Sequence, residues 1–356
     1  MSTLLAVSSS DQAAGCLRRS GVAEDVLAWF DPLHIGPVSQ SQDLDALSRR
    51  RSGYFQLQSF GFSRIGLDYF LARNEILADA AASSDLLLVF QDNLLDQLQL
   101  LQVLDTLANL PERTGRLQVV HVKGFIDELT ETATLALAEH AVDVTSDTFD
   151  VARAAWEAYR QPTPEAWADL AAFDTSALPS LGPAIRRALE ELPDARSGLS
   201  RSQRQILDLL RRQSLTPRDL YRSHFSFEYN SHLEDWVFYA ILDGLADGAY
   251  PLIEGKSDVA FNPGMALIDW RRYVLPAMKL TSYGQAVWRG EVDDRKHNGT
   301  DHWWGGTHLT DGKVWRWDAR GGALLAPGTA AQAAAAAPER DPQNAEAVSE
   351  MSETAA

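Results

Sequence analysis

The chain has 356 residues, of which 45% are apolar and 23% charged, and its formal net charge is −17. At about 100–200 residues per domain, this length predicts two or three globular domains. A single cysteine, Cys16, excludes a disulfide framework, and no apolar run approaches the ~18 residues of a membrane span. The apolar stretch at residues 4–7 is too short for a signal peptide, so we expect a cytoplasmic protein with no membrane partner.

The negative charge is concentrated at the front of the chain. Residues 1–199 carry 15 basic and 28 acidic side chains, whereas residues 200–330 carry 16 of each. An acidic surface repels nucleic acid and anionic membranes over long range, so neither class of partner is expected for the front half.

Four short apolar runs in the first 125 residues predict strands at residues 4–7, 26–30, 86–90 and 117–122. Continuous apolar runs are typical of strands covered on both faces, as in a parallel sheet. Helical patterns lie between them at residues 13–20, 67–82 and 94–107, whereas residues 32–66 are less regular. This alternation predicts an α/β domain with a Rossmann-like parallel sheet over residues 1–125.

Residues 126–197 are predicted to form a helical linker region. Pro162, Pro164 and Pro179 break it into segments. Its aromatic residues Trp156, Tyr159 and Trp167 recur at helical spacings, which favours packing in a core over a binding cage.

Residues 198–325 are predicted to form a winged-helix-like domain, and the Ala- and Glu-rich residues 326–356 a disordered tail. Ser200 and Gln203 form a capping box at the start of a first helix, and Thr216 with Pro217 starts a second at residues 217–223. A third helix is expected over residues 231–247. Apolar segments and a tryptophan-rich hairpin follow it, which is the order of a winged helix-turn-helix.

Several segments in the same order resemble bacterial proteins of the DUF1835 family, a domain of unknown function. The first, SDQAAGCL at residues 10–17, is similar to the family pattern GDSxAGxL, from which it departs at Ser10 and Gln12. The resemblance covers residues 4–318 and implies a domain plan but no activity. The other matching segments are DPLHIGP at 31–37, QDNLLDQL at 91–98, LPSL at 178–181, GLSR at 198–201, WGG at 304–306 and WRWD at 315–318.

Polar residues follow the predicted strands where ligands bind an open parallel sheet, at the carboxyl ends of its strands. We expect them to line one crevice. The predicted ligand-binding residues are Ser10, Asp11, Asp92, Asp96, Gln97 and His121.

The first loop allows two interpretations. Asp11 either caps the following helix or contacts a ligand there, because a helix start both favours an aspartate cap and attracts anions. No G-x-G-x-x-G or Walker sequence is present, so a standard dinucleotide or nucleotide cradle is not expected. No cofactor can be named.

The segment DPLHIGP carries the catalytic candidates, His34 and Asp31. A histidine beside a carboxylate can transfer protons near neutral pH, and the alternative is a turn in which Asp31 bonds backbone amides. Asp92 and Asp96 are four residues apart and would share one face of a helix, where paired carboxylates can bind a divalent metal. The alternative is that one of them caps the helix and the other is solvated. Because this spacing is common by chance, no metal site is predicted. Cys16 lies early in a predicted helix, where a thiolate is favoured, but no base is near it in the sequence, so a buried structural cysteine is favoured over a reactive one. His297, His302 and His308 with Asp301 do not have the spacing of a compact zinc motif.

The third helix of the back half is acidic. No lysine or arginine occurs between Arg222 and Lys256, whereas six acidic residues do. A groove-reading helix needs donors and positive charge, so a protein partner is favoured over DNA. Three hypotheses result. In the first, the crevice holds a small, phosphorylated or nucleotide-like ligand, and the back half relays the binding event to a protein partner. In the second, the protein is a hydrolase or transferase that uses the same crevice, and in the third it is a winged-helix DNA-binding regulator.

Overall fold

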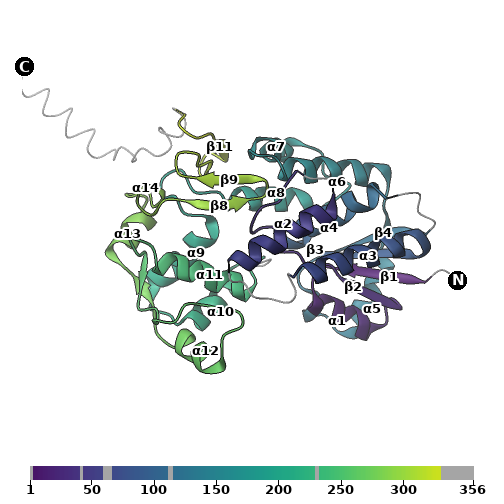
Figure 1. The fold of residues 1–356 in the computed structure, drawn as a ribbon, viewed down its shortest axis with the longest axis horizontal. Helices are drawn as coiled ribbons and strands as arrows, with labels where there is room; N and C mark the ends of the chain where they lie inside the picture. Colours follow the sequence, from purple (N-terminus) through teal and green to yellow (C-terminus); the bar gives the residue numbers. More distant parts are fainter. Residues whose placement is uncertain (1–2, 41–42, 59–65, 111–114, 229–231, 330–356) are drawn as a thin grey trace, which may run out of the picture.

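The computed structural model describes residues 3–40, 43–58, 66–110, 115–228 and 232–329 (Figure 1). Its front half is built on a five-stranded sheet of order β2-β1-β3-β4-β5, in which β5 alone is antiparallel to its neighbour. The four predicted strands are confirmed within two residues at each end. The strands are β1 (Leu4–Ser8), β2 (Asp25–Ala28), β3 (Asp85–Gln91), β4 (Leu117–Val122) and β5 (Val142–Asp143).

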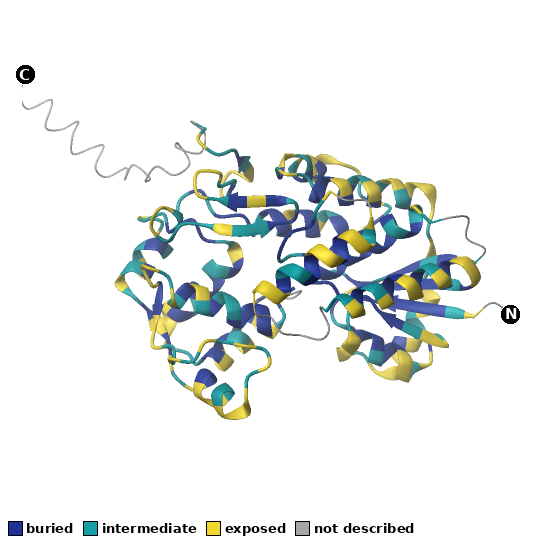
Figure 2. Cartoon of the chain, viewed as in Figure 1, coloured by how far each residue is buried: buried dark blue, intermediate teal, exposed yellow. Residues whose placement is uncertain are grey.

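Both faces of the sheet are buried, which explains its continuous apolar strands. Successive side chains point to opposite faces: Leu86 and Leu88 join one core with α4, whereas Leu87 and Val89 join a second core with α1. Figure 2 shows the strands as mostly buried ribbons between partly exposed helices. The helices of this half are α1 (Asp11–Ser20), α2 (Leu44–Leu57), α3 (Leu67–Ser83), α4 (Leu94–Ala108), η2 (Ile126–Glu128), α5 (Glu131–Ala136) and η3 (Leu137–His140).

Helix α2 and strand β5 were not predicted. The buried face of α2 includes Ser48, Arg51 and Ser52 beside Leu47 and Phe55, so the helix shows no regular apolar stripe in the sequence. Both residues of β5 are exposed, and so short an edge strand leaves no apolar run.

The predicted helical region packs against α4. It contains α6 (Ser146–Tyr159), α7 (Glu165–Asp169), η4 (Leu170–Ala172) and α8 (Leu181–Leu189). Trp156, Tyr159 and Trp167 are each at most 2% exposed, so their prediction as core residues is confirmed. No helix of the described residues is both long and apolar enough to cross a membrane.

The back half begins with three helices, and its core also includes Phe30, Phe55 and Phe70 of the front half. Ser200 and Gln203 form the predicted capping box, and Thr216 caps the second helix with Pro217 at its first position. The second helix runs four residues past its predicted end, and the third begins four residues late, after residues 229–231, which lie outside the described part. The elements are α9 (Arg201–Arg212), α10 (Pro217–Phe227), α11 (Asp235–Ala246), β6 (Ile253–Glu254), α12 (Leu267–Val274), β7 (Lys279–Leu280), α13 (Ser282–Trp288) and α14 (Arg295–Asn298).

The chain then returns to the front half through β8 (Asp301–Trp304) and β9 (Thr307–Thr310), followed by β10 (Arg316–Asp318) and β11 (Ala323–Leu325). Trp304 is buried between Tyr159 and Trp167, with ring centroids 5.2 and 6.2 Å away. The predicted tail is described only as far as residue 329.

The turn of the β8–β9 hairpin touches the backbone of the front half. Gly306 N–H donates to the carbonyl of Tyr159 at 2.9 Å, and a Cβ at Gly306 would lie 2.0 Å from the carbonyl oxygen of Arg160. We expect Gly306→Ala to lower the free energy of unfolding by about 1–3 kcal/mol, because backbone must move to admit the methyl group. Urea unfolding measures this loss.

The matched control is Gly53→Ala in α2, where nothing lies within 4 Å of the added Cβ. This variant should be neutral or slightly stabilising, because alanine is the better helix former. Equal stability of Gly306→Ala and the parent protein would contradict the close packing of the hairpin.

Candidate functional site

The topology of the sheet places a crevice between β1 and β3. The chain leaves β1 toward β2 on one side and then returns past β1 to form β3 on the other side. At such a switch point the two connecting loops diverge, and ligands bind outside the carboxyl ends of the strands.

A cavity of about 680 Å³ lies at this point, within the range of small-molecule sites. The ends of β1 to β4 contribute to it, and so does the back half. Among the described residues its walls are Ser9, Ser10, Gln12, Ala13, Phe30, Gln91, Asn93, Leu95, Asp96, Phe125, Ile126, Asp127, Tyr221, Phe225, His232, Leu233, Glu234, Asp235 and Trp236.

Asp96 is the most buried of the predicted ligand-binding residues that reach the cavity. Its carboxylate accepts the backbone N–H of Gln91 at 2.7 Å and the Nδ2 of Asn93 at 3.1 Å. Burial raises the pKa of Asp96, against the effect of these hydrogen bonds, which lower it. The carboxylate therefore ties the end of β3 to the start of α4 and fixes one wall of the crevice.

Ser10, not Asp11, is the N-cap of α1, because the Ser10 hydroxyl accepts the backbone N–H of Ala13 at 3.2 Å. Ser10 also lines the cavity, whereas Asp11 is exposed at the first helical position and is not among the wall residues. The interpretation of Asp11 as the cap is therefore wrong, and its contact with a ligand stays a prediction.

Three further predicted residues surround the crevice without lining it. Asp92 accepts the backbone N–H of Gly124 at 3.0 Å and so joins the loops after β3 and β4. Gln97 donates to the carbonyl of Gln91 at 2.7 Å and supports the end of β3. His121 lies in β4 with both ring nitrogens buried and without a hydrogen bond in the described residues, and burial lowers its pKa.

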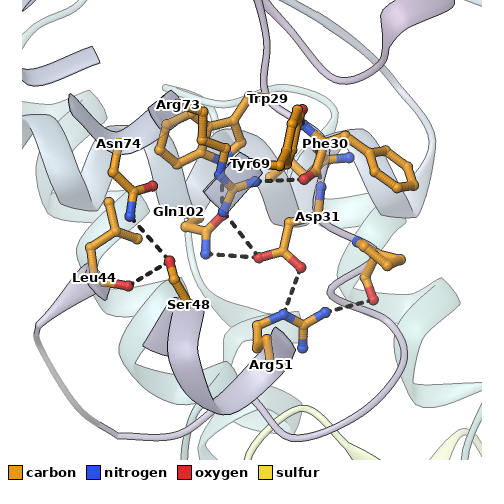
Figure 3. A network of polar contacts seen from close by, with 12 residues as sticks. Trp29, Phe30, Asp31, Leu44, Ser48, Arg51, Tyr69, Arg73, Asn74 and Gln102 are labelled. Carbon is orange, nitrogen blue, oxygen red and sulfur yellow. Dashed lines mark hydrogen bonds and ion pairs between the residues drawn. The ribbon is translucent and has the colours of Figure 1, made fainter. Parts of the chain in front are cut away.

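Asp31 is not among the described wall residues of the crevice and lies in a buried polar network with side chains of α2, α3 and α4 (Figure 3). Its carboxylate accepts Arg51 Nε at 2.6 Å, Arg73 Nη2 at 3.3 Å and Gln102 Nε2 at 3.3 Å, and both arginines are at most 1% exposed. Arg73 also lies 4.1 Å from the ring centroid of Trp29. Asp31 thus serves as the counter-ion of two buried guanidinium groups.

Arg51 explains the shape of the segment DPLHIGP. Its guanidinium donates to the carbonyls of Pro32, Ile35 and Pro37 at 3.0, 3.1 and 3.3 Å, so the loop is wrapped around one buried charge. From the sequence alone this loop was a catalytic candidate, because no nearby residue indicates that Arg51, 20 positions after Asp31, binds it.

His34 makes no hydrogen bond or ion pair with Asp31 and lines a second cavity of about 760 Å³, whose walls also come from α11 and β8. Neither ring nitrogen has a hydrogen bond in the described residues, and the ring packs edge-on against His232 at 5.3 Å. Burial lowers the pKa of His34 to about 3. Such an imidazole is a weak general base near pH 7, because efficient bases have a pKa close to the working pH.

Helices of the back half close the crevice, and the sequence did not identify their residues as part of the site. Phe225 of α10 stacks on Phe125 of the β4 loop, with ring centroids 5.1 Å apart and an interplanar angle of 29°. Tyr221 and Trp236 add two more aromatic walls. The acidic, aromatic composition around residues 221–236 was the available signal, but it was interpreted only as a reason against DNA binding.

The charge of the crevice is negative. Asp96, Asp127, Glu234 and Asp235 line it, and none of the described wall residues is a lysine or an arginine. Gln12 reaches across to Asp127, with Nε2 donating at 2.6 Å. Carboxylates beside aromatic faces attract cations and hydrogen-bond donors and repel phosphate.

The chain matches no model of a known protein family and no curated protein. Among solved structures it is similar to the DNA-binding, cleavage and re-ligation domain of topoisomerase II from Plasmodium falciparum. The identity is 11% and the TM-score 0.43, over 80% of this chain and 48% of that one. The present chain thus spans about half the length of that structure, and so distant a likeness carries no argument about function.

The described residues contain no group of three or more histidine, cysteine, aspartate or glutamate side chains placed to hold a metal ion. His308 pairs with Asp301 at 2.7 Å and stacks on Trp303 at 4.2 Å, so it takes part in a surface contact of the hairpin. Cys16 is buried, and its sulfur accepts Arg19 Nη2 at 3.1 Å.

Proposed function

We propose that this protein binds a small organic ligand in the β1/β3 crevice and that the ligand is a cation or a neutral base with a planar or apolar part. The acidic and aromatic lining carries this proposal. Ammonium groups are held by carboxylates and by the faces of aromatic rings, whereas a phosphate would meet four acidic side chains and no basic one among the described wall residues. This proposal replaces the expectation of a phosphorylated ligand with that of an uncharged or cationic one.

The contact between the two halves supports the proposal that ligand binding in the crevice affects how the back half binds a protein partner. Ligand atoms in the crevice would touch both the strand ends of the front half and helices α10 and α11. Beyond those helices, Leu267, Ile268 and Leu275 at helix α12 are 64–67% exposed. Large exposed apolar side chains grouped on one short segment suit a protein partner.

Within residues 198–325, for which a winged-helix-like domain is predicted, we also propose a winged-helix arrangement of residues 201–280. Its support is the order α9, Leu215, α10, α11, β6, β7, with Leu215 bridged to Met278 beside β7 and with β6 paired to β7. In DNA-binding members of that class the third helix enters the major groove. Here α11 buries Trp236, Val237 and Phe238, which favours an internal and protein-binding role over a DNA-binding one. Membership of the DUF1835 family remains a proposal that supplies no activity.

Thermal unfolding with a matched pair of compounds tests the ligand class. 2-Phenylethylamine should raise the unfolding midpoint, because a ligand at about 100 times its dissociation constant adds about 2.7 kcal/mol to stability. Adenosine, a neutral base, should likewise raise the unfolding midpoint if the crevice accepts uncharged ligands. Phenylacetate has a similar skeleton with a negative charge, and it should give no stabilisation that depends on the crevice residues.

Two variants locate the effect. Phe225→Ala removes an aromatic wall and Asp127→Asn removes a negative charge, and each should reduce the amine-induced shift by at least half. Asp150→Asn, at an exposed position of α6, is the control and should leave the shift unchanged. An amine shift that persists in both crevice variants, or no shift with any cationic or neutral compound, would reject this function.

A further inference from the structure

A separate, smaller cavity of about 290 Å³ lies in the back half, away from the crevice. It is formed by the loop before α9, the start of α9, the end of α13 and the turn between β10 and β11. Its volume is at the lower end of the range for ligand sites, so it suits a molecule of one ring and one polar group.

Five arginines line this cavity in a protein whose formal net charge is −17. They are Arg196, Arg201, Arg204, Arg289 and Arg320, and they face three acidic residues, Glu190, Asp194 and Asp318. The Arg201 guanidinium contacts Glu190 at 2.5 Å, and Arg289 pairs with Glu291 at 2.7 Å. Arg204 Nη1 donates to the carbonyl of Trp288 at 3.1 Å. Five arginines against three acidic residues among the described wall residues give the lining more positive than negative side chains.

Arg196 is the side chain that most clearly lacks a partner. Its guanidinium makes no hydrogen bond or ion pair with any described residue, and its Nε is buried. An unpaired buried donor is costly, because its interaction with water has not been replaced. Gly290, at φ +70°, lies directly beside it, since a Cβ there would be in van der Waals contact with the Arg196 side chain at 3.4 Å.

The backbone N–H groups at the start of α9 are not available to bind an anion in this cavity. Arg201 N–H donates to the carbonyl of Glu190 at 2.8 Å, Ser202 N–H to Glu191 Oε1 at 3.2 Å, and Gln203 N–H to the Ser200 hydroxyl at 3.2 Å. An anion in the cavity would therefore be held by guanidinium groups, which match the geometry of planar and tetrahedral oxyanions.

The cavity also has an apolar side. Trp317, Leu192 and Leu199 line it, and Trp317 is partly buried against the core of the front half. Trp317 is held in place by its backbone, which bonds to Pro193 and Ala195 at 3.0 and 3.2 Å. A flat ring could thus lie against the indole while a charged group reaches the arginines.

We propose that this cavity binds a small planar ring carrying an oxyanion, either a phosphate monoester or a carboxylate. The site is independent of the crevice and opposite to it in charge, so the protein would hold two ligands of different chemistry.

Isothermal titration calorimetry of the full chain with phenyl phosphate, benzoate, inorganic phosphate and phenol tests this proposal. Phenyl phosphate or benzoate should bind more tightly than inorganic phosphate, and phenol should not bind. The stronger of the two aromatic anions identifies the group that the arginines prefer. Absence of binding by both aromatic anions at millimolar concentration would overturn the proposal.

Arg196→Gln should weaken the aromatic anion about tenfold or more, the loss usual for one charge-assisted hydrogen bond. Arg289→Gln is a second variant whose exposed ion pair adds little to stability, so it should fold and also weaken binding. Arg222→Gln, at an exposed position of α10, is the matched control and should bind like the parent chain. Unchanged affinity in both cavity variants would refute the site even if the anion binds.

Discussion

Asp31→Asn is expected to lower the free energy of unfolding by about 3–5 kcal/mol, the usual loss when one partner of a buried ion pair is removed. The substitution keeps the size of the side chain but leaves Arg51 and Arg73, both at most 1% exposed, without their shared counter-ion. Urea unfolding at pH 7 measures the change. A loss this large would be a sizeable fraction of the stability of a typical domain.

Asp79→Asn is the matched control, because Asp79 is exposed on α3 and the same change of charge there should cost less than about 0.5 kcal/mol. Combining Asp31→Asn with Arg73→Met should cost less than the sum of the two single changes, since the residues share one network. A loss below about 1 kcal/mol for Asp31→Asn would show that the network does not carry this stability, and would return Asp31 to the catalytic candidates.

The second large effect is a loss of stability in acid that depends on His34. Its pKa is about 3 in the folded protein, lowered first by burial and then by Arg51 and Arg187, against the raising effect of Glu191 and Asp31. In the unfolded chain a histidine has a pKa near 6.5. The unfolded state therefore binds the proton more tightly, and the contribution of His34 to stability is lost as the pH falls from about 6.5 toward 3.

Between pH 7 and pH 4 this loss amounts to about 3 kcal/mol. His34→Phe and His34→Gln both remove the titrating group, so the stability of each relative to the parent protein should improve by that amount over the interval. The two variants serve as mutual controls, because they differ in packing but share the absence of a proton site. Unfolding free energies of parent and variants that run parallel from pH 7 to pH 4 would contradict the buried environment of His34.

Local patterns were enough to predict much of the fold. The four apolar runs became strands because both faces of the sheet are covered, so that every residue in a strand can be apolar. The caps at Ser200 and Thr216 were predictable because each involves neighbouring residues only. The strand ends did reach one crevice, and Ser10 and Asp96 line it as expected.

The rest of the site could not be predicted from neighbouring residues. Arg51 reaches Asp31 across 20 positions, and its helix has a polar buried face that conceals it from any periodicity. Asp31 and His34 are three residues apart, yet the loop around Arg51 turns one toward an ion-pair network and the other toward a different cavity. Spacing in the sequence therefore suggested an acid–base pair, whereas in the structure the two side chains have different neighbours.

The sequence by itself determined the class of the front half, the two helix caps and the acidity of the chain, because apolar periodicity, capping residues and charge depend on identity and local order. Only the tertiary structure decided that Tyr221, Phe225 and Trp236 close the crevice and that arginines from four segments share one cavity. The physical reason is that a binding site is defined by which surfaces pack together. That packing minimises exposed apolar area over the whole chain and leaves little trace in any one segment.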